Sequence, residues 1–157
     1  IRINTEVMKK TLYLISLLLT SILFTNCTST KEVVAISEAE KNVFNQKEGE
    51  SVVIADEESE YEIIIIDPGF NAWLVSFARP EQFYSQSYLE TRNRLYVTEW
   101  NIRATQPFRY DPNLYEMQIN YSSNVDYGYE VNYKLYNYFI YFQRKYNQRL
   151  GHFVPRI

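Results

Sequence analysis

The sequence predicts a small α+β domain in which a sheet of two or more strands packs with about three helices around an aromatic-rich core. Three observations support this fold class. Residues 63–66 are four consecutive isoleucines, residues 114–121 alternate between apolar and polar side chains, and residues 129–149 carry apolar side chains at helical spacing. β-branched runs and alternation favour strands, whereas a repeat of three and four residues favours a helix.

Aromatic residues supply most of the predicted core. From Ile63 to Ile157 the chain contains seven phenylalanines, two tryptophans and thirteen tyrosines. Each aromatic side chain buries roughly 150–250 Å² in a folded protein, so this segment can form a core despite its modest aliphatic content.

The first predicted elements are a strand, a turn and a short helix. Residues 61–66 suit a strand that is buried on both faces, and the Asp-Pro-Gly sequence at residues 67–69 favours a turn. Residues 71–78 can form two helical turns that place Trp73 and Phe77 on one face.

A longer helix is predicted next. Ser87 and Glu90 have the spacing of a capping box, in which a serine hydroxyl and a glutamate each satisfy a free backbone amide. This helix is expected to continue to about Ala104 and to stop before Pro107.

Residues 114–121 give the clearest strand pattern, with one buried and one solvated face. The solvated face would carry Glu116, Gln118 and Asn120, and residues 122–124 would form the turn that follows.

The last predicted helix extends from about Tyr129 to Arg149, with Gly151 placed to cap its end. Because apolar and tyrosine side chains occur on nearly every face of this helix, we expect it to lie at the centre of the fold.

The N-terminal residues have the pattern of an export signal. Lys9 and Lys10 precede an apolar stretch of 15 residues, Thr11 to Thr25, and Cys27 is the only cysteine of the chain. This pattern resembles a bacterial lipoprotein signal peptide, although Asn26 stands where glycine or alanine is usual. The stretch is shorter than the roughly 20 residues that span a bilayer. We therefore predict lipidation at Cys27; a plain secretory signal or a buried free thiol remains an alternative.

Three parts of the chain follow from this prediction. Residues 1–26 would be upstream sequence and a removed signal peptide, residues 27–60 a lipidated cysteine with an acidic flexible tether, and residues 61–157 the globular domain. From Thr28 to Glu62 there are ten acids against three lysines, a composition that cannot bury enough apolar surface to offset its ordering entropy. A short strand or docking patch near Val52 is the exception that we leave open.

Three segments of the domain support a family resemblance. The sequences at residues 65–74, 96–101 and 138–147 resemble a family of small bacterial envelope lipoproteins that is described as a domain of unknown function. The resemblance covers about residues 61–157. It implies a shared fold and a location in the envelope, but no activity and no catalytic residues.

The candidate binding surface lies on the predicted helix that ends near Ala104. Its residues recur at steps of three and four: Arg92, Tyr96, Glu99, Trp100 and Arg103. In one interpretation, two guanidinium groups flank one carboxylate beside two aromatic rings, and together they form the wall of a binding cleft. In the alternative, which we favour, Arg92, Glu99 and Arg103 form an Arg–Glu–Arg bridge on the helix surface, and Trp100 belongs to the core.

No catalytic residue, metal site or cofactor is predicted. The only histidine is His152, and a lipidated Cys27 could not act as a nucleophile. A zinc site is improbable with one histidine and no free thiol. A carboxylate-based hydrolase would need Glu99 as its acid with Glu116 or Asp111 as its partner, and we rank it last.

The sequence therefore favours a non-enzymatic, Tyr-rich envelope lipoprotein that binds or scaffolds another envelope protein. A module that binds peptidoglycan or another glycan is the alternative. We expect a lipid anchor in the outer membrane, with the domain facing the periplasm. Nucleic acid is not an expected partner, because the chain after residue 26 is acidic and has no basic stripe.

Overall fold

A computed structural model describes residues 7–11, 13, 15, 34–46, 52–55, 62–65 and 67–157. The chain divides into two units, Ile1–Glu32 and Val33–Ile157. In the first unit the described residues 7–11 are helical, and Cys27 with most of the predicted signal peptide lies outside the described residues. None of the described helices is both long and apolar enough to cross a membrane.

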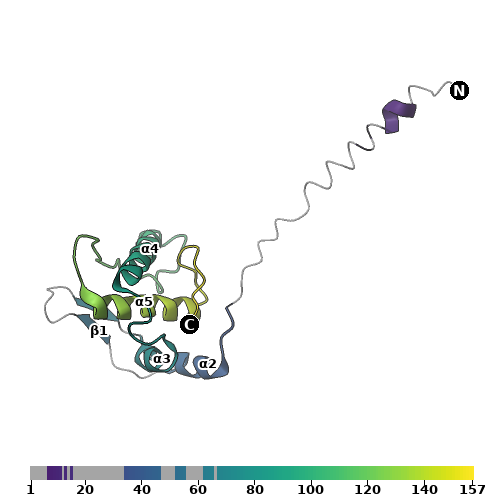
Figure 1. The fold of residues 1–157 in the computed structure, drawn as a ribbon. Coiled ribbons are helices and arrows are strands. Elements are labelled where there is room, and N and C mark those ends of the chain that lie inside the picture. The colour runs from purple at the N-terminus through teal and green to yellow at the C-terminus, as the bar shows by residue number, and fades with distance from the viewer. Residues whose placement is uncertain are drawn as a thin grey trace. The chain divides into compact units, whose positions relative to one another are not determined.

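The second unit contains four helices and two short strands among its described residues. In chain order they are α2 (Glu38–Phe44), β1 (Val52–Ala55), β2 (Glu62–Ile65), α3 (Phe70–Phe77), α4 (Gln86–Ala104) and α5 (Gly128–Lys145) (Figure 1).

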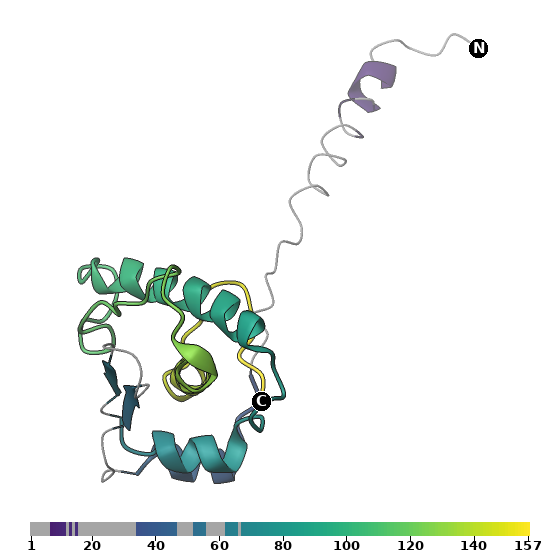
Figure 2. The same ribbon diagram turned by 60° about the vertical axis from the view of Figure 1, so that its left-hand side comes forward.

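Helix α5 occupies the centre of this unit, as its sequence predicted. Figure 2 shows it end-on, with α4 on one side and α3 with α2 on the other. It packs against α4, α3 and β1. Phe139 and Tyr141 are fully buried, and Val131, Tyr136 and Phe142 are nearly so. Burial on several faces explains why this helix needs aromatic side chains around most of its circumference.

The predicted α+β fold class is wrong, because the fold is helical. β1 and β2 form an antiparallel hairpin in which Val52 pairs with Ile65 and Ala55 with Glu62. Among the described residues, this two-stranded hairpin is the whole sheet. Helices, loops and this one hairpin therefore surround α5. The predicted strand at residues 61–66 is confirmed as β2, and the aromatic-rich core is also present.

The predicted strand at residues 114–121 is wrong, because this segment is an irregular chain. Side chains of α4 take the place of a neighbouring strand. Trp100 Nε1 donates to the Met117 carbonyl (2.9 Å), while the Asn101 side chain accepts from the Ile119 amide (2.8 Å) and donates to its carbonyl (2.9 Å). These bonds satisfy the Met117 carbonyl and both backbone groups of Ile119 without a second strand.

The helix boundaries agree with the sequence in part. α3 and the end of α4 lie where they were predicted. α4 begins earlier, because Ser85 and not Ser87 is its N-cap and accepts from the Tyr88 amide (3.3 Å).

Helix α5 ends before the predicted Arg149. Asn147 adopts a left-handed conformation (φ 49°) directly after the C-cap Tyr146, and the Gln148 amide donates to the Gln143 carbonyl (2.9 Å). This geometry is that of a Schellman cap, for which asparagine can replace glycine. Gly151 therefore lies beyond the helix end and does not cap it.

The compact unit begins at Val33, so the described part of the predicted tether is folded into the domain. α2 packs against α3, and its Glu40 is fully buried. Arg144 of α5 holds this carboxylate through two bonds, Nε to Oε1 (2.5 Å) and Nη2 to Oε2 (2.6 Å). Trp73 Nε1 donates to the same carboxylate (2.9 Å). Composition suggested a solvated segment, but one acid of this segment has its counter-charge more than one hundred residues later.

Candidate functional site

The two aromatic residues of the predicted surface belong to the core. Tyr96 is 2% exposed and Trp100 6% exposed. The Trp100 ring lies 4.7 Å from Phe142 and 5.0 Å from Tyr115, measured between ring centroids. Burial raises the pKa of Tyr96 above its ordinary value. Neither ring offers a face to a ligand.

Glu99 and Arg103 form the ion pair that their spacing predicts. Arg103 Nε and Nη2 both donate to Glu99 Oε1, at 2.9 and 2.7 Å. Arg103 Nη1 also donates to the Tyr115 hydroxyl (2.8 Å), and Nη2 donates to the Arg149 carbonyl. Burial lowers the pKa of Arg103, but hydrogen bonds to Glu99 and Tyr115 outweigh it and leave the pKa raised. The Arg103 guanidinium therefore joins α4 to the irregular segment at residues 114–121 and to Arg149, which follows the end of α5.

Arg92 lies apart from Glu99. Its guanidinium carbon is 3.2 Å from the centroid of the Phe153 ring and 5.0 Å from that of Tyr88. Its Nη1 atom is buried and has no hydrogen-bond partner among the described residues. The structure therefore does not bring two guanidinium groups to one carboxylate.

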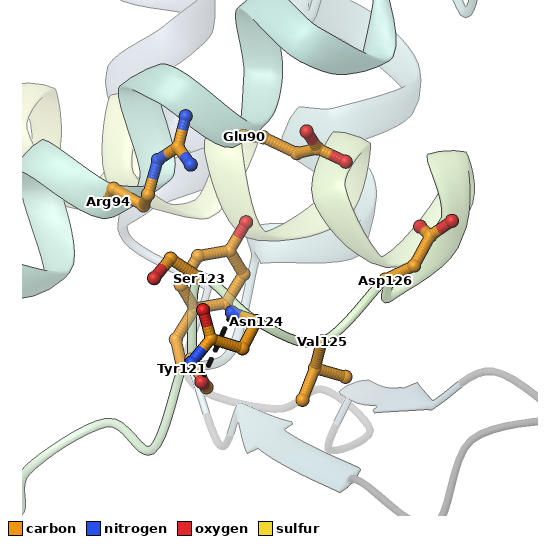
Figure 3. A pocket seen from close by; sticks show the side chains of 8 residues that line it. Glu90, Arg94, Tyr121, Ser123, Asn124, Val125 and Asp126 are labelled. Carbon is orange, nitrogen blue, oxygen red and sulfur yellow. Dashed lines mark hydrogen bonds between the residues drawn. The ribbon is translucent and has the colours of Figure 1, made fainter.

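A different part of the domain is concave. A cleft of about 320 Å³ lies between α4 and the loop that precedes α5 (Figure 3). Its lining comprises Glu90, Arg94, Tyr121, Ser122, Ser123, Asn124, Val125 and Asp126. Most of these side chains carry a polar group that can donate or accept a hydrogen bond.

Two carboxylates of the cleft share one donor. The Gln86 side-chain amide donates to Glu90 Oε1 and to Asp126 Oδ1, both at 2.9 Å. Asp126 Oδ1 also accepts from the Gly128 amide (3.0 Å), which fixes the start of α5. Because the hydrogen bonds involve one oxygen of each carboxylate, Glu90 Oε2 and Asp126 Oδ2 can accept further hydrogen bonds.

Tyr121 forms the inner wall of the cleft. Its ring stacks on Tyr127, with centroids 4.8 Å apart and planes at 16°. Its hydroxyl donates to Asn132 Oδ1 (2.7 Å), and Asn93 Nδ2 donates to the same oxygen (3.1 Å). Burial, with Glu90 as the second cause, raises the pKa of Tyr121 to about 12. The wall of the cleft is therefore fixed by buried asparagines from α4 and α5.

Sequence reasoning missed this cleft. The turn at residues 122–124 was predicted, but as the end of a strand. The arrangement depends on a chain reversal that brings this turn back to α4, and no local pattern encodes that approach. Among the described residues, no group of three or more acidic, histidine or cysteine side chains is arranged to hold a metal ion.

Comparison with known proteins identifies a family but no function. The model of a family described as "Family of unknown function (DUF6146)" matches residues 13–154. No curated protein and no solved structure matches this chain.

Proposed function

The chain belongs to DUF6146, a family of unknown function, and from this premise we propose that it is a non-enzymatic binding protein of the bacterial envelope whose α4 cleft holds a glycan. The proposed location depends on the signal-like N-terminal sequence and on lipidation at Cys27. Peptidoglycan is the polymer nearest to a domain anchored in this way.

The polar lining of the cleft is the observation that carries the proposal. Sugar hydroxyl groups both donate and accept hydrogen bonds. Glu90 and Asp126 supply acceptors, and Arg94 and the side-chain amide of Asn124 supply donors. The Tyr121 ring supplies an apolar wall. A volume near 320 Å³ lies at the lower end of the range typical of small-ligand sites. These properties favour the glycan alternative over the protein partner that the sequence ranked first.

The test is retention of the purified domain on insoluble peptidoglycan and on a panel of soluble neutral and acidic polysaccharides. We expect wild-type binding and a roughly tenfold weaker Kd for Glu90→Gln, because hydrogen bonds to charged groups contribute about 1.5–3 kcal/mol. Glu116→Gln removes an exposed carboxylate outside the cleft and is the matched control. If the wild-type domain binds none of these glycans, the proposal is wrong.

A protein partner is the second candidate, and the exposure of Phe108 favours it. This side chain is fully exposed, and Met117 is 77% exposed. Aromatic side chains and methionine are enriched at protein interfaces. A photoreactive residue at position 108 in intact envelopes tests this candidate. One defined protein adduct, together with no glycan binding, would favour the second candidate over the first.

A further inference from the structure

Glu90 and Arg94 of the cleft do not form the ion pair that their spacing predicts. A glutamate followed four residues later by a basic residue normally forms an ion pair on a helix. Glu99 and Arg103 do so on α4 (2.7 Å), and Glu130 and Lys134 do so on α5 (2.5 Å). The pair that lines the cleft, Glu90 and Arg94, has the same spacing and direction but does not form this contact.

The hydrogen bonds of each side chain explain why Glu90 and Arg94 do not pair. Glu90 turns toward the start of α4, where it accepts from Gln86 (2.9 Å). Arg94 donates through Nη2 to the Thr91 hydroxyl (3.3 Å), its one hydrogen bond within the described part of the chain. Figure 3 shows the Glu90 carboxylate directed away from Arg94 and toward Asp126. Most of the five N–H donors of Arg94 are therefore free at one end of the cleft.

We infer that Arg94 binds a carboxylate of the ligand, so that the cleft selects an acidic glycan over a neutral one. This inference rests on the proposed glycan-binding function. A guanidinium matches a carboxylate with two parallel hydrogen bonds, and such charge-assisted bonds are stronger than neutral ones. A sugar that carries a carboxylate would place it at Arg94 and its hydroxyl groups toward the other end.

The acids of the cleft set the orientation of this ligand. Glu90 and Asp126 both hydrogen-bond to Gln86, so their charges lie close to one another. A ligand carboxylate at that end would meet two like charges, whereas hydroxyl groups there can donate to Glu90 Oε2 and Asp126 Oδ2. The charge distribution therefore orients the ligand as well as selecting it.

The experiment compares two forms of one oligosaccharide by calorimetry. An oligogalacturonide is the acidic probe, and the same oligomer after reduction of its carboxyl groups is the neutral probe. We expect the wild-type domain to bind the acidic form about tenfold more tightly at low salt, with a smaller difference at higher salt. Arg94→Gln should abolish this preference. Arg109→Gln, which removes an exposed arginine outside the cleft, should leave it unchanged.

The outcomes separate this inference from the function on which it rests. Equal binding of both probes, unaffected by Arg94→Gln, would overturn the role of Arg94 but leave the glycan-binding proposal in place. If neither probe nor any other glycan binds, both proposals fail. A preference for the acidic form that is the same in Arg94→Gln would show that another cation recognises the carboxylate, which also contradicts the inference.

Discussion

The ion pair between Glu40 and Arg144 is the most deeply buried charge pair among the described residues. The two side chains are 1% and 4% exposed. Arg144 also donates to the carbonyl oxygens of Ala35 (3.1 Å) and Pro155 (3.0 Å). Since each charge is paired and also hydrogen-bonded, the pair is tolerated in a low-dielectric interior, but removal of either partner leaves the other uncompensated.

Glu40→Gln should therefore destabilise the domain by about 3–5 kcal/mol, the range observed when one member of a buried ion pair is removed. Glu38→Gln is the matched control on the same helix. It affects the exposed pair with Lys41 (2.6 Å) and should change the free energy of unfolding by about 1 kcal/mol or less. Urea unfolding of both variants measures the difference. Similar losses in the two variants would contradict the role given to burial.

At the residue scale, the sequence could predict only interactions along one helix. Glu99 and Arg103 are four residues apart, and their ion pair follows from helix geometry. Arg92 lies seven residues before Glu99, and its position is set by Phe153, far away in the chain. For the same reason, neither the Glu40 ion pair nor the cleft at Arg94 could be predicted from spacing.

At the element scale, α2 is a structural part of the domain and not a segment of a tether. It is only seven residues long, and an isolated helix of that length is not stable in water. Its stability must come from the contacts with α3 and from the bonds of Glu40 to Trp73 and Arg144. In return, α2 supplies the only carboxylate to which Arg144 is bonded among the described residues.

A chain that begins at Lys47 should consequently be less stable than one that begins at Val33, by about 3 kcal/mol or more, because Arg144 loses its counter-charge. Chemical unfolding of the two chains measures the difference. In the shorter chain, Arg144→Met should restore part of the lost stability by removing the unpaired charge. Equal stability of the two chains would instead support the flexible tether that the composition predicted.

Elements were predicted correctly where local pattern and tertiary environment agree. α3 and α5 lie close to their predicted positions because their apolar periodicity matches the faces that they bury. Burial follows the alternation in residues 114–121 only in part, since Tyr115 is buried and Glu116, Gln118 and Asn120 are exposed, but Met117 on the predicted buried face is 77% exposed. Alternation requires only an extended chain with one covered face, however. Trp100 and Asn101 satisfy the backbone of Met117 and Ile119 from a helix, which takes the place of pairing with a strand at these two residues.

At the scale of the whole domain, tyrosine hydroxyl groups connect the irregular segments to the helices. Tyr133 donates to the Arg79 carbonyl (2.7 Å), and Tyr121 joins its loop to α5. The Tyr141 and Tyr146 hydroxyls both reach the carboxylate of Asp67, at 3.0 and 3.2 Å. Each of these bonds requires a protonated phenol where the tyrosine is the donor. The fold therefore depends on tyrosines that remain neutral.

The pKa values of these groups predict sensitivity to alkali. Burial, followed by the charge of Asp67, raises the pKa of Tyr146 to about 12, and that of Tyr121 is also raised to about 12. Burial likewise raises the pKa of Tyr136, Tyr138 and Tyr141 above the ordinary value of 10. The folded chain thus holds protons that the unfolded chain releases near pH 10. The stability from these groups is complete below about pH 10 and decreases as the pH rises toward about 12.

We therefore expect the Tm to fall by at least roughly 5 °C between about pH 9 and about pH 11, which corresponds to a loss of the order of 1 kcal/mol for a domain of this size. The measurement is thermal unfolding by circular dichroism together with phenolate absorbance. Phenolate should appear in two stages, first from exposed tyrosines and then with unfolding.

Because Lys145 also pairs with Asp67, the control compares Tyr121→Phe, which lies in the cleft, with Tyr146→Phe, which lies beside that pair. Each variant should lose less Tm over this range than the wild type does. If all tyrosines ionise near their ordinary pKa while the fold and the Tm persist, the neutral hydroxyls do not contribute to stability as proposed.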